Sequence, residues 1–189
     1  MTDKMTEKEI ENFSIEDTDQ YPVMPLRYTV LFPQQVIPIY IGRERSLKLI
    51  DELDPKRKYI VVVAQEDGSI EDPEPKDLYS YGTLANVLKV FDMPDNSKSA
   101  IVQGISRVKI LDYTSVAPYY KAAIHTLDDE PLDNELEVEA LSSNLRQSFS
   151  ELMNVAPNLT EEHTGMLSNI QKPNRLTDRA ISLMTVPNK

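Results

Sequence analysis

Histidines, paired carboxylates and serines are the residues of this chain that could perform chemistry, and none has the neighbours that catalysis requires. His125 and His163 have no histidine or cysteine at ligand spacing, so a metal site is not predicted. No serine lies in a Gly-x-Ser-x-Gly sequence, and a phosphate-binding loop is absent. The pairs Asp128-Asp129 and Glu161-Glu162 lie beside loops or helix starts, where solvated carboxylates are common. We therefore predict no catalytic residue, no metal and no cofactor in this chain.

The composition is that of an ordinary soluble protein with an excess of acids. The chain has 189 residues, 40% of them hydrophobic, and a net charge of -11, so it can bury a core as one domain or as two small ones. This charge disfavours nucleic-acid binding, which depends on lysine and arginine. The sequence has no cysteine, no secretion signal and no apolar run of about 18 residues that could span a membrane. We expect a cytoplasmic protein without membrane contact.

Residues 1–20 differ from the remainder in charge. They contain seven acids and two lysines, a local charge of -5. Such a composition cannot bury enough apolar surface to fold alone. We predict an acidic, poorly ordered tail.

A proline-rich stretch, Tyr21 to Ser46, must position whatever surface this chain presents. Its prolines remove backbone donors and exclude a long helix or an unbroken central strand. The sequences "PVMPL" and "VIPIYI" therefore predict two irregular strands with prolines at a strand start or a sheet edge. Leu47, Ile50 and Leu53 then follow at helical spacing, which predicts a short amphipathic helix from Arg45 to Leu53.

The following residues are typical of a curved sheet. "YIVVVAQ" predicts a strand buried on both faces, and residues 66–81 form a polar, proline-rich loop. "GTLANVLKVFDM" and "SAIVQGISRVKILDY" predict a hairpin around a tight turn at 94–97, in which Val108, Ile110 and Asp112 share one face. Gly104 suggests a bulge or bend. With "YYKAAIHTL", residues 21–127 form a β-rich lobe of about six strands and one helix, either a curved sheet or an open barrel.

The hydrophobic period changes to that of helices in residues 128–189. Leu141, Leu145, Phe149 and Leu152 form one stripe. Thr160 is a good N-cap for a second helix with Met166, Leu167 and Ile170 on its apolar side. Pro173 opens a third helix, in which Leu176, Ala180, Leu183 and Met184 align. The predicted fold class is therefore α+β, with a β-rich lobe followed by a helical bundle.

Two adjacent segments are candidates for a binding surface. Arg43, Glu44, Arg45 and Lys48 stand at the start of the first helix and predict a charged, exposed patch, although from spacing alone a solvated helix end explains them better than a binding surface. The loop around Pro33 would place apolar and amide groups beside that patch, although core packing also explains its apolar members. These loop residues are Phe32, Gln34, Gln35 and Ile37.

The stretch "PVMPLRYTVLFPQQVIPIYIGRERS" resembles the start of the N-terminal substrate-binding domain of Lon, the ATP-dependent serine protease. The similarity continues through "VVVAQEDG", "DLYSYGTLANVLKVFDMPDNSKSAIVQGISRVKI" and "NIQKPNRLTDRAISLM". One departure is Tyr28, where the family usually has aspartate after Leu-Arg. The ATPase module, with ATP and Mg, and the Ser-Lys protease module of that family are not present, so we expect a truncated piece of a longer protein.

The resemblance implies a PUA-like β-lobe, a helical lobe leading toward the ATPase, and a role in recognising unfolded or degron-bearing proteins within a homo-hexamer. It makes the Arg43–Lys48 segment the expected client contact. Three alternatives remain at this point: a stand-alone adaptor built on the same domain, an RNA-binding PUA-like domain, which the acidity disfavours, and a small hydrolase, for which no nucleophile with a base is found.

Overall fold

The computed structural model describes residues 20–129, 134–153 and 161–184. The chain divides into two compact units, residues 1–128 and 129–189. The predicted acidic tail before Gln20 and the predicted N-cap Thr160 lie outside the described residues. No helix within the described ranges is long and apolar enough to cross a membrane.

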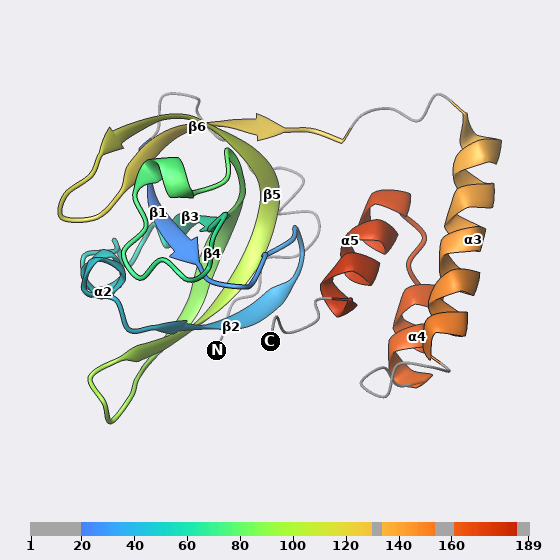
Figure 1. Cartoon of the computed structure of the whole chain (residues 1–189), viewed down its shortest axis with the longest axis horizontal. Helices are drawn as coiled ribbons and strands as arrows, with labels where there is room; N and C mark the ends of the chain where they lie inside the picture. Colours follow the sequence, from blue (N-terminus) through green and yellow to red (C-terminus); the bar gives the residue numbers. More distant parts are fainter. Residues whose placement is uncertain (1–19, 130–133, 154–160, 185–189) are drawn as a thin grey trace. The chain divides into compact units, whose positions relative to one another are not determined.

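The first unit is a six-stranded sheet that curls on itself, in the order β2-β5-β4-β3-β1-β6 with a further pairing of β5 and β6. The β5 strand is 18 residues long: it pairs with β4 over residues 98–109, with β2 over residues 98–103 and with β6 over residues 107–115 (Figure 1). The strands are β1 (Gln20–Leu26), β2 (Val36–Ile41), β3 (Tyr59–Ala64), β4 (Tyr81–Asp92), β5 (Lys98–Ser115) and β6 (Lys121–Leu127).

The two proline-bearing strands differ in their pairing. The β2 strand pairs with β5 alone and is an edge strand, as predicted. The β1 strand lies between β3 and β6, pairing with β3 in parallel from Val23 to Leu26 and with β6 from Gln20 to Pro22. Its predicted edge position is therefore correct only for its second half, which faces no strand on the β6 side.

Gly104 allows the chain to cross over β5. A β-carbon at this position would lie 2.3 Å from the carbonyl oxygen of Phe32, so only glycine lets the loop at residues 31–35 approach so closely. The register of β4 and β5 shifts next to Gly104, which confirms the predicted bulge. A further shift follows Ile110, and for this reason Asp112 is exposed instead of sharing the buried face of Val108 and Ile110 as predicted.

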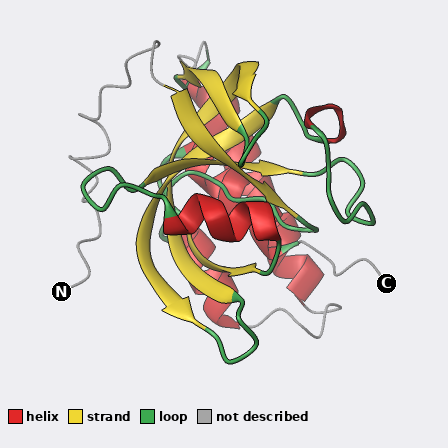
Figure 2. Cartoon of the chain, turned by 90° about the vertical axis from the view of Figure 1, so that its left-hand side faces the viewer, coloured by secondary structure: helices red, strands yellow, loops and turns green. Residues whose placement is uncertain are grey.

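Helix α2 (Glu44–Asp51) packs against one side of the barrel, as Figure 2 shows. It buries Leu49 and Ile50 in a core cluster that also contains Met24, Leu26 and Ile39. Lys98 of β5 pairs with Asp51 of α2 at 3.1 Å. A short 3-10 helix, η1 (Pro75–Asp77), interrupts the predicted polar loop between β3 and β4.

The second unit contains α3 (Glu135–Met153), α4 (Glu161–Ser168) and α5 (Pro173–Leu183), and α3 packs on both shorter helices. Its buried core consists of Phe149, Leu167, Leu176 and Ala180. The predicted helical stripe is only partly buried, because Leu141 is 60% exposed. Met166 and Met184, which we expected on buried faces, are also exposed.

Candidate functional site: a groove between two strands

A large hollow lies where β1 and β2 face each other without pairing. It has a volume of about 930 Å³ and is bordered by Met24 to Arg27 of β1 and its following loop, and by Pro38 to Gly42 of β2. The start of α2 and the acidic loop that contains Glu71 and Asp72, between β3 and β4, complete its rim. The remaining lining residues are Thr29, Arg43, Glu44, Arg45, Ser46, Glu71 and Asp72. The groove therefore combines an apolar base with a charged rim.

Arg43 lies across the β1 side of the groove. Its guanidinium donates to Gln65 Oε1 at 2.5 Å and approaches the carbonyl oxygen of Pro25 at 3.5 Å. Burial lowers the pKa of Arg43 below its usual value, and the nearby charge of Arg27 lowers this pKa further. The two guanidinium groups therefore repel each other at this end of the groove.

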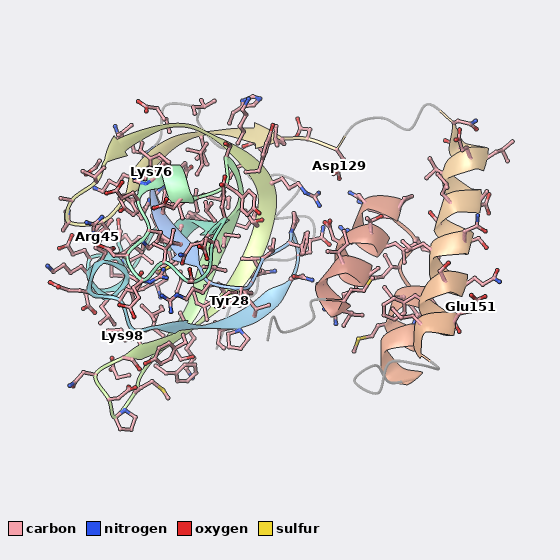
Figure 3. All side chains as sticks on the ribbon, in the orientation of Figure 1. Tyr28, Arg45, Lys76, Lys98, Asp129 and Glu151 are labelled. Carbon is pink, nitrogen blue, oxygen red and sulfur yellow. The ribbon has the colours of Figure 1, made fainter. Side chains whose placement is uncertain are left out.

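Arg45 ties the start of α2 to the acidic loop. Its guanidinium donates to the hydroxyl of Tyr120 and lies 5.0 Å from the centre of the Tyr120 ring, while the Tyr120 hydroxyl donates to the carbonyl of Pro73 at 2.9 Å. Arg45 also pairs with Asp72 at 3.7 Å. In Figure 3, Arg45 is labelled beside α2. This side chain therefore positions one wall of the groove through a buried tyrosine.

Glu44 and Lys48 form an exposed pair one helical turn apart, with 2.8 Å between Glu44 Oε1 and Lys48 Nζ. Their hydrogen bond lowers the pKa of Glu44 and raises that of Lys48. The predicted charged and exposed patch therefore needs correction. Glu44 and Lys48 are exposed, but Arg43 and Arg45 are partly buried because each satisfies polar groups beneath the helix start. Lys48 does not line the groove.

The loop that follows β1 forms the opposite corner of the rim. Arg27 donates to the carbonyl of Ile70 at 3.1 Å, and Gln65 donates to the same carbonyl at 2.9 Å. The ring of Tyr28, a residue with φ 50, covers Gly68, where a β-carbon would lie 2.3 Å from the ring. Tyr28 thus holds this loop through an aromatic contact with Gly68. Sequence reasoning missed the roles of Arg27, Gln65 and the acidic loop, because only the fold brings them to the groove.

The predicted apolar loop lies outside the groove lining. Gln34 donates from its backbone to Gly104 at 2.9 Å, and Gly104 donates back to Gln35 at 2.9 Å. The buried Thr83 hydroxyl donates to the carbonyl of Leu31 at 2.6 Å. Phe32, Gln34, Gln35 and Ile37 are all partly buried. These bonds give the loop a structural role, and its contact with a client stays a prediction.

Exposed apolar side chains that the sequence did not indicate lie on the hairpin of β4 and β5. Val90, Phe91 and Met93 are exposed there, and Tyr40 of β2 is 69% exposed and donates from its hydroxyl to Asp95 at 3.1 Å. Large apolar side chains on adjoining strands are a common feature of binding surfaces. Alternation in β4 could have shown that Phe91 faces outward, but not that Tyr40 would adjoin it.

The described residues offer binding groups and no catalytic arrangement. No group of three or more histidine, aspartate or glutamate side chains is placed to hold a metal within the described ranges. His125 is exposed on β6 opposite Lys109 of β5. Of the eight predicted contact residues, the groove lining contains Arg43, Glu44 and Arg45.

The described residues thus combine a β-rich unit that carries a groove with a helical unit that follows it in the sequence. A family profile described as "ATP-dependent protease La (LON) substrate-binding domain" matches residues 20–189. The chain belongs to this family.

Similar proteins carry the name Lon protease. Lon protease 2 of Sorangium cellulosum is 37% identical over 163 residues, which are 86% of this chain and 20% of the relative. The Lon protease of Koribacter versatilis is 38% identical over 162 residues, again 86% of this chain and 20% of the relative. The chain thus spans about a fifth of the length of these relatives.

A solved structure supports the fold. The N-terminal domain of the Lon protease from the Mycobacterium avium complex has a TM-score of 0.51 and 17% identity, with 88% of this chain and 96% of that chain covered. At this identity the similarity concerns the fold alone.

Proposed function

We propose that this chain recognises exposed segments of unfolded or degron-bearing proteins and delivers them to an ATP-dependent protease of the Lon type. The groove between β1 and β2 carries this proposal. Its apolar base can accept hydrophobic side chains that native proteins bury, and its charged rim keeps the empty site compatible with water. The family to which the chain belongs supports the same role.

The chain itself acts as a binding module in this proposal. Cleavage and ATP hydrolysis belong to other modules of the longer proteins that it resembles, and self-association occurs in the homo-hexamer of such a parent in the cytoplasm. Six copies would bind one client by avidity, so that each groove can bind weakly. Weak individual sites allow a client to be passed on after capture.

Binding to the unfolded and folded forms of one protein tests the proposal. The probe is a reduced, alkylated disulfide protein, and the reference is its native oxidised form. We expect the 189-residue chain to bind the unfolded form at least about tenfold more tightly, because only that form exposes apolar segments. Equal binding of both forms would contradict the proposal.

A charge exchange tests whether the rim takes part. The double variant Glu44→Lys with Lys48→Glu keeps the net charge but replaces the carboxylate on the groove rim at position 44 with an ammonium group. We expect a change of about threefold or more in affinity for the unfolded probe. Lys56→Glu, at an exposed position outside the groove lining, is the control and should change affinity less. If both variants leave binding unchanged, recognition lies elsewhere, and the exposed hairpin face is the next surface to test.

A further inference from the structure

The free edge of β2 presents backbone groups to the groove. The backbone of Gly104 exchanges hydrogen bonds with Gln34 and Gln35. The backbone amides and carbonyls of the even-numbered residues in this part of β5 therefore point toward β2. The register pairs Ile37 with Val102, Ile39 with Ala100 and Ile41 with Lys98. Because antiparallel pairs alternate between bonded and non-bonded, these three residues of β2 bond to β5. The amide and carbonyl of Tyr40 and the carbonyl of Pro38 therefore point away from β5, into the groove that both residues line.

The opposite wall has a similar interruption. Val23 of β1 donates to the carbonyl of Tyr120 at 2.8 Å, and the pairing with β6 ends there. By the same alternation, the backbone groups of Pro25 and Arg27 point toward the groove. Those of Leu26 point toward β3, since its carbonyl accepts a hydrogen bond from the backbone amide of Gln65 at 3.0 Å. No strand lies between this part of β1 and β2, and the carbonyl of Pro25 already accepts a hydrogen bond from the guanidinium of Arg43 at 3.5 Å, so an added strand would pair through the β2 edge.

Prolines limit how strongly either edge can pair. Pro25 and Pro38 carry no amide hydrogen, so each wall lacks one donor in the middle of the groove. Among the β2 residues that line the groove, Tyr40 can exchange both backbone bonds with an added strand. An added strand would therefore be held by few bonds and released readily, whereas two complete edges would pair tightly with other copies of the chain.

The charges at the β1 end specify part of the ligand. Arg27 and Arg43 both line the groove at this end, and after burial the nearby charge of Arg27 also lowers the pKa of Arg43. An additional carboxylate between the two guanidinium groups would relieve this repulsion. The groove is therefore complementary to an extended segment that carries an acidic side chain among apolar ones.

We propose that the groove binds an extended apolar segment with one acidic residue by strand addition to β2 at Tyr40, with the acid beside Arg27 and Arg43. This inference rests on the proposed function and specifies how that site binds its clients. Recognition through the client's backbone explains how one groove can accept many sequences, since every polypeptide offers the same amide and carbonyl groups. The single acidic preference adds modest selectivity.

Backbone N-methylation tests the strand directly. The probe is a fluorescein-labelled peptide of alternating valine and threonine with one central aspartate, bound to the 189-residue chain. Two further versions of this peptide are N-methylated on alternate residues: the first phase carries the methyl groups at odd-numbered positions, and the second phase at even-numbered positions. An added strand turns one phase toward β2 and the other away, so we expect one version to bind at least about tenfold more weakly and the other to bind within about twofold of the parent.

Protein variants isolate the backbone group of Tyr40. Tyr40→Pro removes the amide hydrogen and the ring, whereas Tyr40→Ala removes the ring alone. Because this amide is not used by β5, both variants should keep the circular dichroism spectrum of the parent. We expect Tyr40→Pro to bind the peptide about threefold to tenfold more weakly than Tyr40→Ala. Arg27→Gln should remove the preference for aspartate over asparagine in the peptide, and the exposed control Lys56→Gln should keep it.

The outcomes separate this inference from the proposed function. A loss confined to one N-methyl phase supports strand addition. Equal effects of the two phases on a peptide that binds overturn strand addition and leave client recognition standing, with side chains as its basis. Absence of peptide binding together with absence of binding to the unfolded protein overturns both. An unchanged preference for aspartate in Arg27→Gln overturns the assigned acidic position.

Discussion

Two segments flank β2, namely the loop at residues 31–35 and the helix start at residues 42–48. They contain similar mixtures of polar and apolar residues but are held in different ways. The loop is fixed by backbone bonds to Gly104 and by the bond from Thr83 to Leu31. The helix start is fixed by side chains, since Arg43 binds Gln65 and Arg45 binds Tyr120. The first segment should therefore tolerate changes of its own side chains, whereas the second should not.

The largest effect is expected at Gly104. The variant Gly104→Ala should lower the free energy of unfolding by about 3 kcal/mol, because the new methyl group meets the backbone of Phe32, which cannot move without breaking its own contacts. Chemical denaturation measures this loss. The control Gly165→Ala adds a methyl group with no atom within 4 Å inside a helix, and should raise stability by about 0.5–1 kcal/mol. A mild effect at Gly104 would show that the loop is not fixed through its backbone.

A smaller effect is expected at Arg43. The variant Arg43→Ala should lower the free energy of unfolding by about 2 kcal/mol, because the buried Gln65 loses its charged partner. The same variant should weaken binding of the unfolded probe. Lys48→Ala, which removes an exposed i,i+4 pair, should cost far less stability than Arg43→Ala, because solvent screens this pair. Similar costs for the two variants would show that Arg43 is no more structural than a surface lysine.

The third prediction concerns pH and the tyrosine pair behind Arg45. Tyr113 packs edge-on against Tyr120 with 6.0 Å between ring centres, and burial raises the pKa of Tyr113 to about 12. Above its ordinary pKa of about 10 the unfolded chain ionises first and binds fewer protons, so stability is present below pH 10 and falls toward pH 12. We expect a loss of about 1.5 kcal/mol from this residue, measured by denaturation at several alkaline pH values.

The variant Tyr113→Phe provides the control for that measurement. The Tyr113 hydroxyl is buried without a hydrogen-bond partner among the described residues, so its removal should leave stability at pH 7 nearly unchanged. The variant should reduce the decrease in the free energy of unfolding between pH 10 and pH 12, so that only the contributions of Tyr119 and Tyr120 to this decrease remain. An equally steep decline in the variant would assign the effect to those two tyrosines.

The smallest effect is expected at Gly68, where a β-carbon would come equally close to its neighbour as at Gly104. The neighbour is here the exposed ring of Tyr28, which can rotate away. Gly68→Ala should therefore cost about 1 kcal/mol or less by thermal unfolding. In the background Tyr28→Ala the cost should disappear, and a cost that persisted there would show that the loop backbone itself is strained.

The sequence predicted the strands well because their patterns are local. The β-branched run of β3, the turn at 94–97 and the alternation from Arg107 to Leu111 each predict structure without knowledge of the partner strand. The exposure of Leu141 was not predictable in this way, since a helical stripe gives one face but not how much of it the neighbouring helices reach. The role of Arg43 was missed for the same reason, because Gln65 is distant in sequence and becomes its partner only through the parallel pairing of β1 and β3.

The position of β1 between β3 and β6 has a consequence for how the chain folds during synthesis. The β1 strand pairs with β6, which follows about a hundred residues later in the sequence, so the barrel cannot close until β6 has been made. Contacts so distant in sequence form slowly and leave strand edges open meanwhile. At that stage the nascent chain itself exposes the unpaired apolar strands of an unfolded client.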